Sequence, residues 1–261
     1  TVMKTRAKAD WLSALEAAFT PRTAGMVIET IQGEGGINPV PAAYLRRARE
    51  LADRHNALLV FDEIQCGIGR PGVHFAYQLH SPAIVPDVVT MAKPIACGLP
   101  LGAVIASEQA AAAIAPGMHG TTFGGGALAC RVALEFYEIL EELLPQMRQV
   151  SAQIFDGLET LRRKHSFIKD VRGAGLMIGV EIEYPCKHFV QMGMAQGLLF
   201  NVTHDTVVRM LPPYPCLSAG RARLSGRLGF AEDARQPFQR SIGFPLRQDV
   251  GGQHAHHRVV G

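Results

Sequence analysis

The stretch ALLVFDE (57–63) decides the fold, because an unbroken apolar run ends there in two acidic residues. A run this short, without alternation, predicts a strand that is buried on both faces of a sheet. AGMVIET (24–30) has the same form earlier in the chain, and DVVTMA (87–92) has it later and stops at Lys93. GAVIA (102–106) follows a turn rich in Gly and Pro. These four segments predict the strands of one sheet.

The segment between the first two of these strands is predicted to be a helix. Ala42–His55 has a helical composition, and Pro41 stands before it at a position typical of a helix start. Short apolar strands that alternate with helices are typical of a parallel sheet covered on both faces. The sequence therefore predicts an α/β fold with a mainly parallel sheet.

The pattern changes after Phe123. Helices are predicted over Ala127–Leu144 and Met147–His165, with a break at Pro145, and a strand–turn–strand unit over Phe167–Tyr184. One further helix and two short strands are predicted at His188–Gln196, Leu198–Val202 and Val207–Leu211. This order indicates a smaller α+β domain. We therefore divide the chain into a large-domain portion (1–125), a small domain (126–214) and a tail (215–261).

The 261 residues are 19% charged and allow one or two domains, and their composition excludes a disordered or a transmembrane protein. The first twenty residues lack both an initiator Met and a secretory leader, so we expect that the natural beginning lies elsewhere. Five cysteines without a CxxC pair indicate neither a zinc site nor a disulfide framework, and they favour the cytoplasm. His254, His256 and His257 are interpreted as solvated.

The net charge of +3 comes from the tail alone. Of the 26 Lys and Arg, seven lie in 215–261, and of the 23 Asp and Glu, three lie there, which leaves 19 basic against 20 acidic residues before Pro215. Few aromatic residues accompany the basic ones, so we expect no nucleic-acid partner. The near-neutral body fits an enzyme of small metabolites.

Three of the predicted strands end in chemically active side chains. Glu29, Asp62 and Lys93 are 33 and 31 residues apart, and parallel strands would bring all three to the carboxyl edge of the sheet, where such folds bind ligands. Taken singly, each is more often a turn or surface residue. A partly desolvated Lys93 amine is a nucleophile toward an aldehyde, and Asp62 needs a cationic partner. A protonated pyridine is such a partner, so the pair points to pyridoxal-phosphate chemistry.

Four segments carry a resemblance to a known family. VIETIQGEGG (27–36), LLVFDEIQCGIGR (58–70), PDVVTMAKPIACGLPLGAVIA (86–106) and HGTTFGG (119–125) resemble the class III aminotransferases, which are fold-type I enzymes that depend on pyridoxal 5′-phosphate. The likeness covers about residues 10–214. Within the family, GLLFNVTHDTVVRMLPPY (197–214) resembles the subgroup that takes N-acetylornithine as its amino donor in arginine biosynthesis.

This resemblance implies a cofactor role for five residues. Lys93 would hold pyridoxal phosphate as a Schiff base and shuttle the proton, and Asp62 would pair with the pyridinium nitrogen. Gln65 would bind the ring hydroxyl, and Ile64 would pack on the ring. Thr122 would bind the cofactor phosphate from a neighbouring subunit, which implies a homodimer with shared active sites.

The resemblance also implies how two substrates share one pocket. Arg209 would bind the second carboxylate of 2-oxoglutarate, and Glu34 would pair with Arg209 when the amino donor is bound. A guanidinium suits a carboxylate because its fork is bidentate and permanently charged. Ornithine, succinylornithine and 4-aminobutyrate stay open as alternative donors.

The chain departs from the family pattern in three places. Members run to roughly four hundred residues, so we expect part of the large domain to be missing, which would leave an open sheet edge and exposed apolar faces. Gly126 and Ala127 stand where the family has Asn-Pro. The tail lacks the expected strand and helix, which suggests a frame disruption near Tyr214. The alternative to an active transaminase is therefore an inactive remnant.

Overall fold

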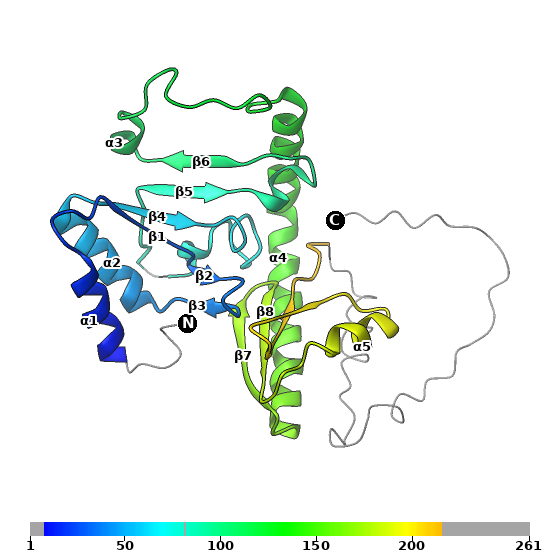
Figure 1. Cartoon of the computed structure of the whole chain (residues 1–261). Coiled ribbons are helices and arrows are strands. Elements are labelled where there is room, and N and C mark those ends of the chain that lie inside the picture. The colour runs from blue at the N-terminus through cyan, green and yellow to red at the C-terminus, as the bar shows by residue number, and fades with distance from the viewer. Residues whose placement is uncertain (1–7, 81, 216–261) are drawn as a thin grey trace.

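The computed structural model describes residues 8–80 and 82–215. Its first sheet has the order β1-β4-β5-β6 (Figure 1), and its strands are Gly25–Ile28 (β1), Leu58–Asp62 (β4), Val88–Met91 (β5) and Ala103–Ala106 (β6). The first three run parallel, and β6 is antiparallel to β5. All four predicted strands are confirmed, and the carboxyl ends of β1, β4 and β5 meet at one edge.

Two helices cover one face of this sheet. They are α1 (Lys8–Ala18) and α2 (Ala42–His55), and the second has the predicted bounds. Pro41 is its N-cap, and Asn56 ends it in the left-handed conformation. One apolar cluster joins both helices to the sheet, with members including Leu15, Phe19, Leu45, Leu51, Leu59 and Phe61. Removal of this apolar surface from water is what holds the helices and the sheet together.

The opposite face of the sheet is open. Alternate residues of the strands point to it, and Val27 on β1 and Val104 on β6 are 69% and 64% exposed. The prediction that helices cover both faces was therefore wrong for the described residues, whereas the expected exposure of apolar surface is found. Asp62 is on this face, two residues after Val60.

A short hairpin leaves the carboxyl end of β1. It consists of β2 (Ile31–Gln32) and β3 (Asn38–Pro39), which pair antiparallel. Ile37 in its tip is fully buried although its φ is +52°, a conformation that strains a β-branched residue. The hairpin contacts the second sheet, because β3 packs beside β7.

Helix α4 (Ala127–Lys164) is continuous, so the predicted break at Pro145 was wrong. Leu144 and Met147 on the two sides of this proline are both buried in one apolar cluster, and their packing offsets the hydrogen bond that proline cannot make. Three short helices precede α4, namely η2 (Ala76–Leu79), η3 (Lys93–Ala96) and α3 (Glu108–Ala111). In Figure 1, α4 passes the carboxyl ends of β4 and β5 and continues along the second sheet.

The second sheet is antiparallel, in the order β7-β8-β10-β9. Its elements are β7 (Ile168–Ala174), β8 (Met177–Ile182), α5 (Phe189–Ala195), β9 (Asn201–Thr203) and β10 (Val207–Met210). The predicted α+β character is therefore found, while the boundary near residue 126 stays a prediction. Among the described residues, no helix has both the length and the apolar character needed to cross a membrane. The predicted tail lies outside the described residues, apart from Pro215.

Candidate active site

Asp62 is the last residue of β4 and lies at the carboxyl edge of the first sheet. Its Oδ1 atom accepts a hydrogen bond of 3.0 Å from the backbone N–H of Ile64 and one of 3.3 Å from the hydroxyl of Thr90. Thr90 stands opposite Asp62 on the neighbouring strand β5. Both contacts use one oxygen and fix the plane of the carboxylate, which is half-buried.

Lys93 follows β5 and is the first residue of η3. Its φ is +51°, so the chain turns sharply at this point. The side chain is exposed, and the expectation of a partly desolvated amine was therefore wrong for the described chain. Pro94 and Ile95 constrain the backbone and leave the amino group in solvent at the strand edge.

Glu34 and Arg209 form the predicted pair between the hairpin and the second sheet. The Nη1 atom of Arg209 donates to Oε1 of Glu34, and its Nε donates to Oδ1 of Asn201 at 2.8 Å. Arg209 is 9% exposed, whereas the Glu34 side chain is 74% exposed. The hydrogen bond from Arg209 lowers the pKa of Glu34, and the more distant charge of Lys93 contributes in the same direction.

Gln65, three residues after Asp62, reaches this ion pair. Its Oε1 atom is 3.5 Å from Nη1 of Arg209, and its amide lies against Gly33. A Cβ atom at Gly33 would come within 1.6 Å of that oxygen, so a larger residue at this position would have to displace the amide of Gln65. Ile64 is half-buried beside Gln65. The structure thus brings Glu34, Gln65 and Arg209 together.

Glu29, the third strand-end residue, has a local role. Its Oε2 atom accepts a hydrogen bond of 2.9 Å from the backbone N–H of Gly33 and closes the turn into the hairpin. This is the ordinary role of an acid at a strand end, and it leaves Asp62 and Lys93 as the pair available for chemistry.

Thr122 is exposed in the segment that precedes α4. The contacts of the described residues join it to none of the other candidate residues. Its predicted role in a neighbouring subunit therefore stays a prediction.

Three residues that support the site were missed from the sequence. Thr90 orients Asp62, Asn201 orients Arg209, and Thr203 donates its hydroxyl to the carbonyl oxygen of Glu34 at 2.5 Å. Asn201 pairs with Arg209 across the β9–β10 hairpin, so the hairpin register is a signal that could have identified it. Thr90 and Thr203 needed the three-dimensional arrangement.

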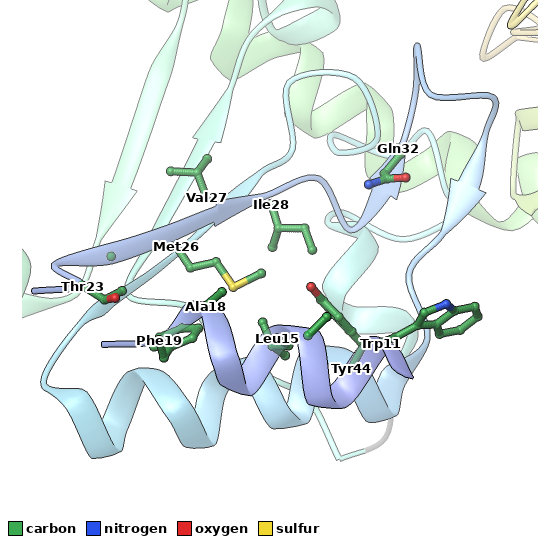
Figure 2. A pocket seen from close by; sticks show the side chains of 12 residues that line it. Trp11, Leu15, Ala18, Phe19, Thr23, Met26, Val27, Ile28, Gln32 and Tyr44 are labelled. Carbon is green, nitrogen blue, oxygen red and sulfur yellow. The ribbon is translucent and has the colours of Figure 1, made fainter. Parts of the chain in front are cut away.

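A separate cavity of about 490 Å³ lies between α1, α2 and the edge strand β1. Figure 2 shows Leu15, Met26 and Ile28 pointing into it, while Val27 points away to the open face. None of the candidate residues lines this cavity. The chemistry-bearing groups therefore lie on the open edge of the sheet and not in this apolar cavity.

Comparison with known proteins identifies the family. The family described as aminotransferase class III matches residues 3–226, which extends past the predicted limit at Tyr214. The chain belongs to the class III aminotransferase family. Acetylornithine aminotransferase of Methanocaldococcus jannaschii is 45% identical over 204 residues, which are 77% of this chain and 51% of that protein.

Two solved structures illustrate the likeness. Ornithine aminotransferase from Toxoplasma gondii, which shows partial occupancy of PLP at its active site, has a TM-score of 0.75 and 34% identity over 83% of this chain and 52% of that one. N-acetylornithine aminotransferase from Stenotrophomonas maltophilia K279a has a TM-score of 0.70 and 33% identity, with 83% and 59% covered. The chain spans about half the length of the curated relatives it matches.

Proposed function

We propose that this class III chain provides the catalytic residues of an aminotransferase that moves an amino group from N-acetylornithine to 2-oxoglutarate. The observation that carries the proposal is the hydrogen bond between Arg209 and Glu34, with the Oε1 atom of Gln65 at 3.5 Å from the same guanidinium nitrogen. A buried guanidinium paired with an exposed carboxylate can exchange that partner for a substrate carboxylate.

The residues present fit pyridoxal 5′-phosphate. Lys93 offers a primary amine for an aldehyde, Asp62 offers a carboxylate for a pyridinium nitrogen, and Gln65 offers an amide for a ring hydroxyl. The Oδ1 atom of Asp62 is held by Ile64 and Thr90, so the carboxylate is oriented in advance. When bound, the cofactor supplies the electron sink that stabilises negative charge on the substrate Cα.

The chain's own residues divide the remaining work. Lys93 would hold the cofactor through its primary amine, and the same amine would then be the group that moves a proton to and from the reacting carbon. Asp62 would accept the hydrogen bond of the ring nitrogen, and its negative charge would favour the protonated ring. Ile64 would pack against the ring and would exclude water from one side of it.

Arg209 and Glu34 allow one pocket to accept two different substrate side chains. With N-acetylornithine, Glu34 keeps its hydrogen bond to Arg209 and cancels the positive charge. With 2-oxoglutarate, the second carboxylate takes the place of Glu34 on a guanidinium that Asn201 continues to orient. The high exposure of Glu34 favours this exchange, because the released carboxylate is solvated at little cost.

The choice of donor rests on the relatives. The curated relatives are acetylornithine aminotransferases that are 40–45% identical to this chain. The solved structures do not separate the two donors, because ornithine aminotransferases at 27–35% identity and acetylornithine aminotransferases at 30–33% are both among them. We further propose a cytoplasmic homodimer in which Thr122, exposed before α4, reaches the cofactor phosphate of the neighbouring subunit.

The test is purification of the chain with pyridoxal phosphate. We expect a yellow absorbance band that Lys93→Ala abolishes and Lys169→Ala retains, because Lys169 pairs with Glu183 on the second sheet, away from the strand edge. N-acetylornithine should be consumed faster than ornithine with 2-oxoglutarate as acceptor. A chain without the band and without turnover would instead be the inactive remnant.

A further inference from the structure

Arg172 on β7 joins the second sheet to the hairpin that carries Glu34. Its Nε atom donates to the carbonyl oxygens of Gly36 and Ile37, each at 3.0 Å, and its Nη2 donates to Gly36 at 2.7 Å. These residues lie more than 130 positions apart in the chain. All three hydrogen bonds go to the backbone, so they hold the hairpin whatever the Glu34 side chain does.

Two carboxylates orient this guanidinium. The Nη1 atom of Arg172 lies 2.9 Å from Oδ2 of Asp170 and 2.7 Å from Oε2 of Glu181. The Arg172 side chain is 14% exposed, and its planar fork is therefore fixed before it reaches the hairpin. A lysine could place only one compact charge at this position.

The hairpin tip needs such a restraint. Gly36 and Ile37 both have positive φ, at +105° and +52°, and the second value strains an isoleucine. Ile37 is fully buried against the second sheet, where a Cβ atom at Gly179 would lie 2.8 Å from its own Cβ. Strained turns persist where their surroundings fix them, and Arg172 fixes this one at the carbonyl oxygens.

Three residues of the second sheet thus hold the hairpin, and only one of them acts through the Glu34 carboxylate. Arg209 binds the carboxylate, whereas Thr203 and Arg172 bind backbone carbonyl oxygens. We propose that Arg172 is a positioning residue that keeps the hairpin 31–39 docked while Arg209 changes its partner from Glu34 to a substrate carboxylate. This inference rests on the proposed function. It explains how Glu34 can pair with Arg209 again after the substrate carboxylate has left, because the hairpin that carries Glu34 has not moved.

Amide hydrogen exchange of the hairpin tests this. The reporters are the N–H groups of Gly33, Gly36 and Ile37, which donate to Glu29 and to the carbonyl oxygen of Gly33. In Arg172→Met we expect these amides to exchange at least tenfold faster, while amides of the β7–β8 ladder keep their rates. Arg172→Lys should fall between the two.

Two further variants sharpen the result. Lys169→Met removes an ion pair from the same strand without touching the hairpin and should leave the three amides unchanged. Thr203→Val should accelerate them less than Arg172→Met, and it gives a second measurement if the latter folds poorly. Unchanged hairpin exchange in both Arg172 variants, or equal acceleration throughout the second sheet, would overturn the proposal.

A second arm separates this inference from the proposed function. Glutarate, a dicarboxylate that cannot react, is added to the chain and to Arg172→Met. With glutarate, we expect the hairpin amides to stay protected in the unmodified chain. In Arg172→Met they should exchange faster than without glutarate, because the variant has lost the hydrogen bonds to the hairpin backbone. If glutarate changes the amide exchange rates in neither protein, the proposed change of partner at Arg209 is wrong. The rates measured without glutarate still decide whether Arg172 holds the hairpin.

Discussion

The hydroxyl of Thr30 donates a hydrogen bond of 3.0 Å to Oε1 of Glu63, and this contact ties the carboxyl ends of β1 and β4 together. The same carboxylate accepts the backbone N–H groups of Ala76 and Tyr77 at 2.8 and 3.0 Å. Glu63 is fully buried, next to Asp62 in the sequence. One carboxylate therefore fixes the strand edge on which the candidate active site is built.

Glu63→Gln should destabilise the chain. The amide has one acceptor oxygen in place of two, so a buried N–H group loses its partner at a cost of about 1–3 kcal/mol. The free energy of unfolding, measured with urea, is the readout. Glu183→Gln changes an exposed carboxylate and should stay within about 0.5 kcal/mol of the unmodified chain. Equal stability of both variants would contradict a structural role for Glu63.

The pH dependence of that stability has a defined sign. Burial raises the pKa of Glu63, and the hydrogen bonds from Ala76 and Tyr77 only partly oppose this. Because the pKa of Glu63 is raised in the folded state, its contribution to the free energy of unfolding is complete below the unfolded pKa near 4.5. That contribution is lost as the pH rises through the folded pKa. The difference between the chain and Glu63→Gln should therefore shrink as pH rises from 4 upward.

Replacement of glycine by alanine should have opposite effects on stability at Gly175 and at Gly157. A Cβ atom at Gly175 would lie 2.2 Å from the carbonyl carbon of Pro71, and its φ is +56°. Gly175→Ala should therefore cost about 3 kcal/mol or more, because the backbone must move. Gly157 lies within α4 with nothing near its missing Cβ, so Gly157→Ala should stabilise the helix by about 0.5–1 kcal/mol. Thermal unfolding distinguishes the two, and a stabilised Gly175→Ala would refute the close approach.

The cysteines should differ sharply in reactivity. Burial raises the pKa of Cys66 to about 12, and Cys66 is fully buried, whereas Cys97 is exposed. The thiolate is the reactive form, so iodoacetamide at pH 8 should label Cys97 and spare Cys66 in the folded chain. Peptide mass spectrometry locates the label, and denaturant should make both react. Fast labelling of Cys66 without denaturant would show that this edge opens.

Local sequence patterns predicted the first sheet because each strand is a short apolar run that packs into the sheet regardless of distant partners. They failed at Pro145, since Leu144 and Met147 hold the helix straight through contacts that no local rule contains. They also failed for Lys93, whose neighbours Pro94 and Ile95 turn the chain without covering the amine.

The candidate site shows the same division. Asp62 and Lys93 follow from strand ends, and the resemblance supplied Glu34 and Arg209. The role of Arg172 could not be predicted in this way, because it depends on hydrogen bonds to carbonyl oxygens of the hairpin, which packs against the second sheet. Contacts between segments more than 130 residues apart are set by packing, which a pattern read along the chain does not contain.

Glu34→Gln should strengthen the binding of a dicarboxylate. The substitution removes the carboxylate that competes for Arg209 and leaves Asn201 to orient the guanidinium. Because the Glu34 side chain is 74% exposed, the competing pair is worth no more than about 1 kcal/mol, so the Kd for glutarate should fall by about two- to fivefold. Calorimetric titration measures it, with Glu183→Gln as the control that should leave the Kd unchanged.

The pH profile tells this competition apart from a general loosening of the hairpin. The hydrogen bond from Arg209 lowers the pKa of Glu34, so its carboxylate stays ionised below the ordinary value of 4.5. The competition of this carboxylate for Arg209 is therefore complete above the ordinary pKa and is lost only as the pH falls through the lowered pKa. The gain in glutarate affinity of Glu34→Gln should accordingly be constant from pH 8 to 5 and disappear at lower pH. A gain that vanished near pH 7, or an affinity loss at every pH, would show that Glu34 supports Arg209 and does not compete for it.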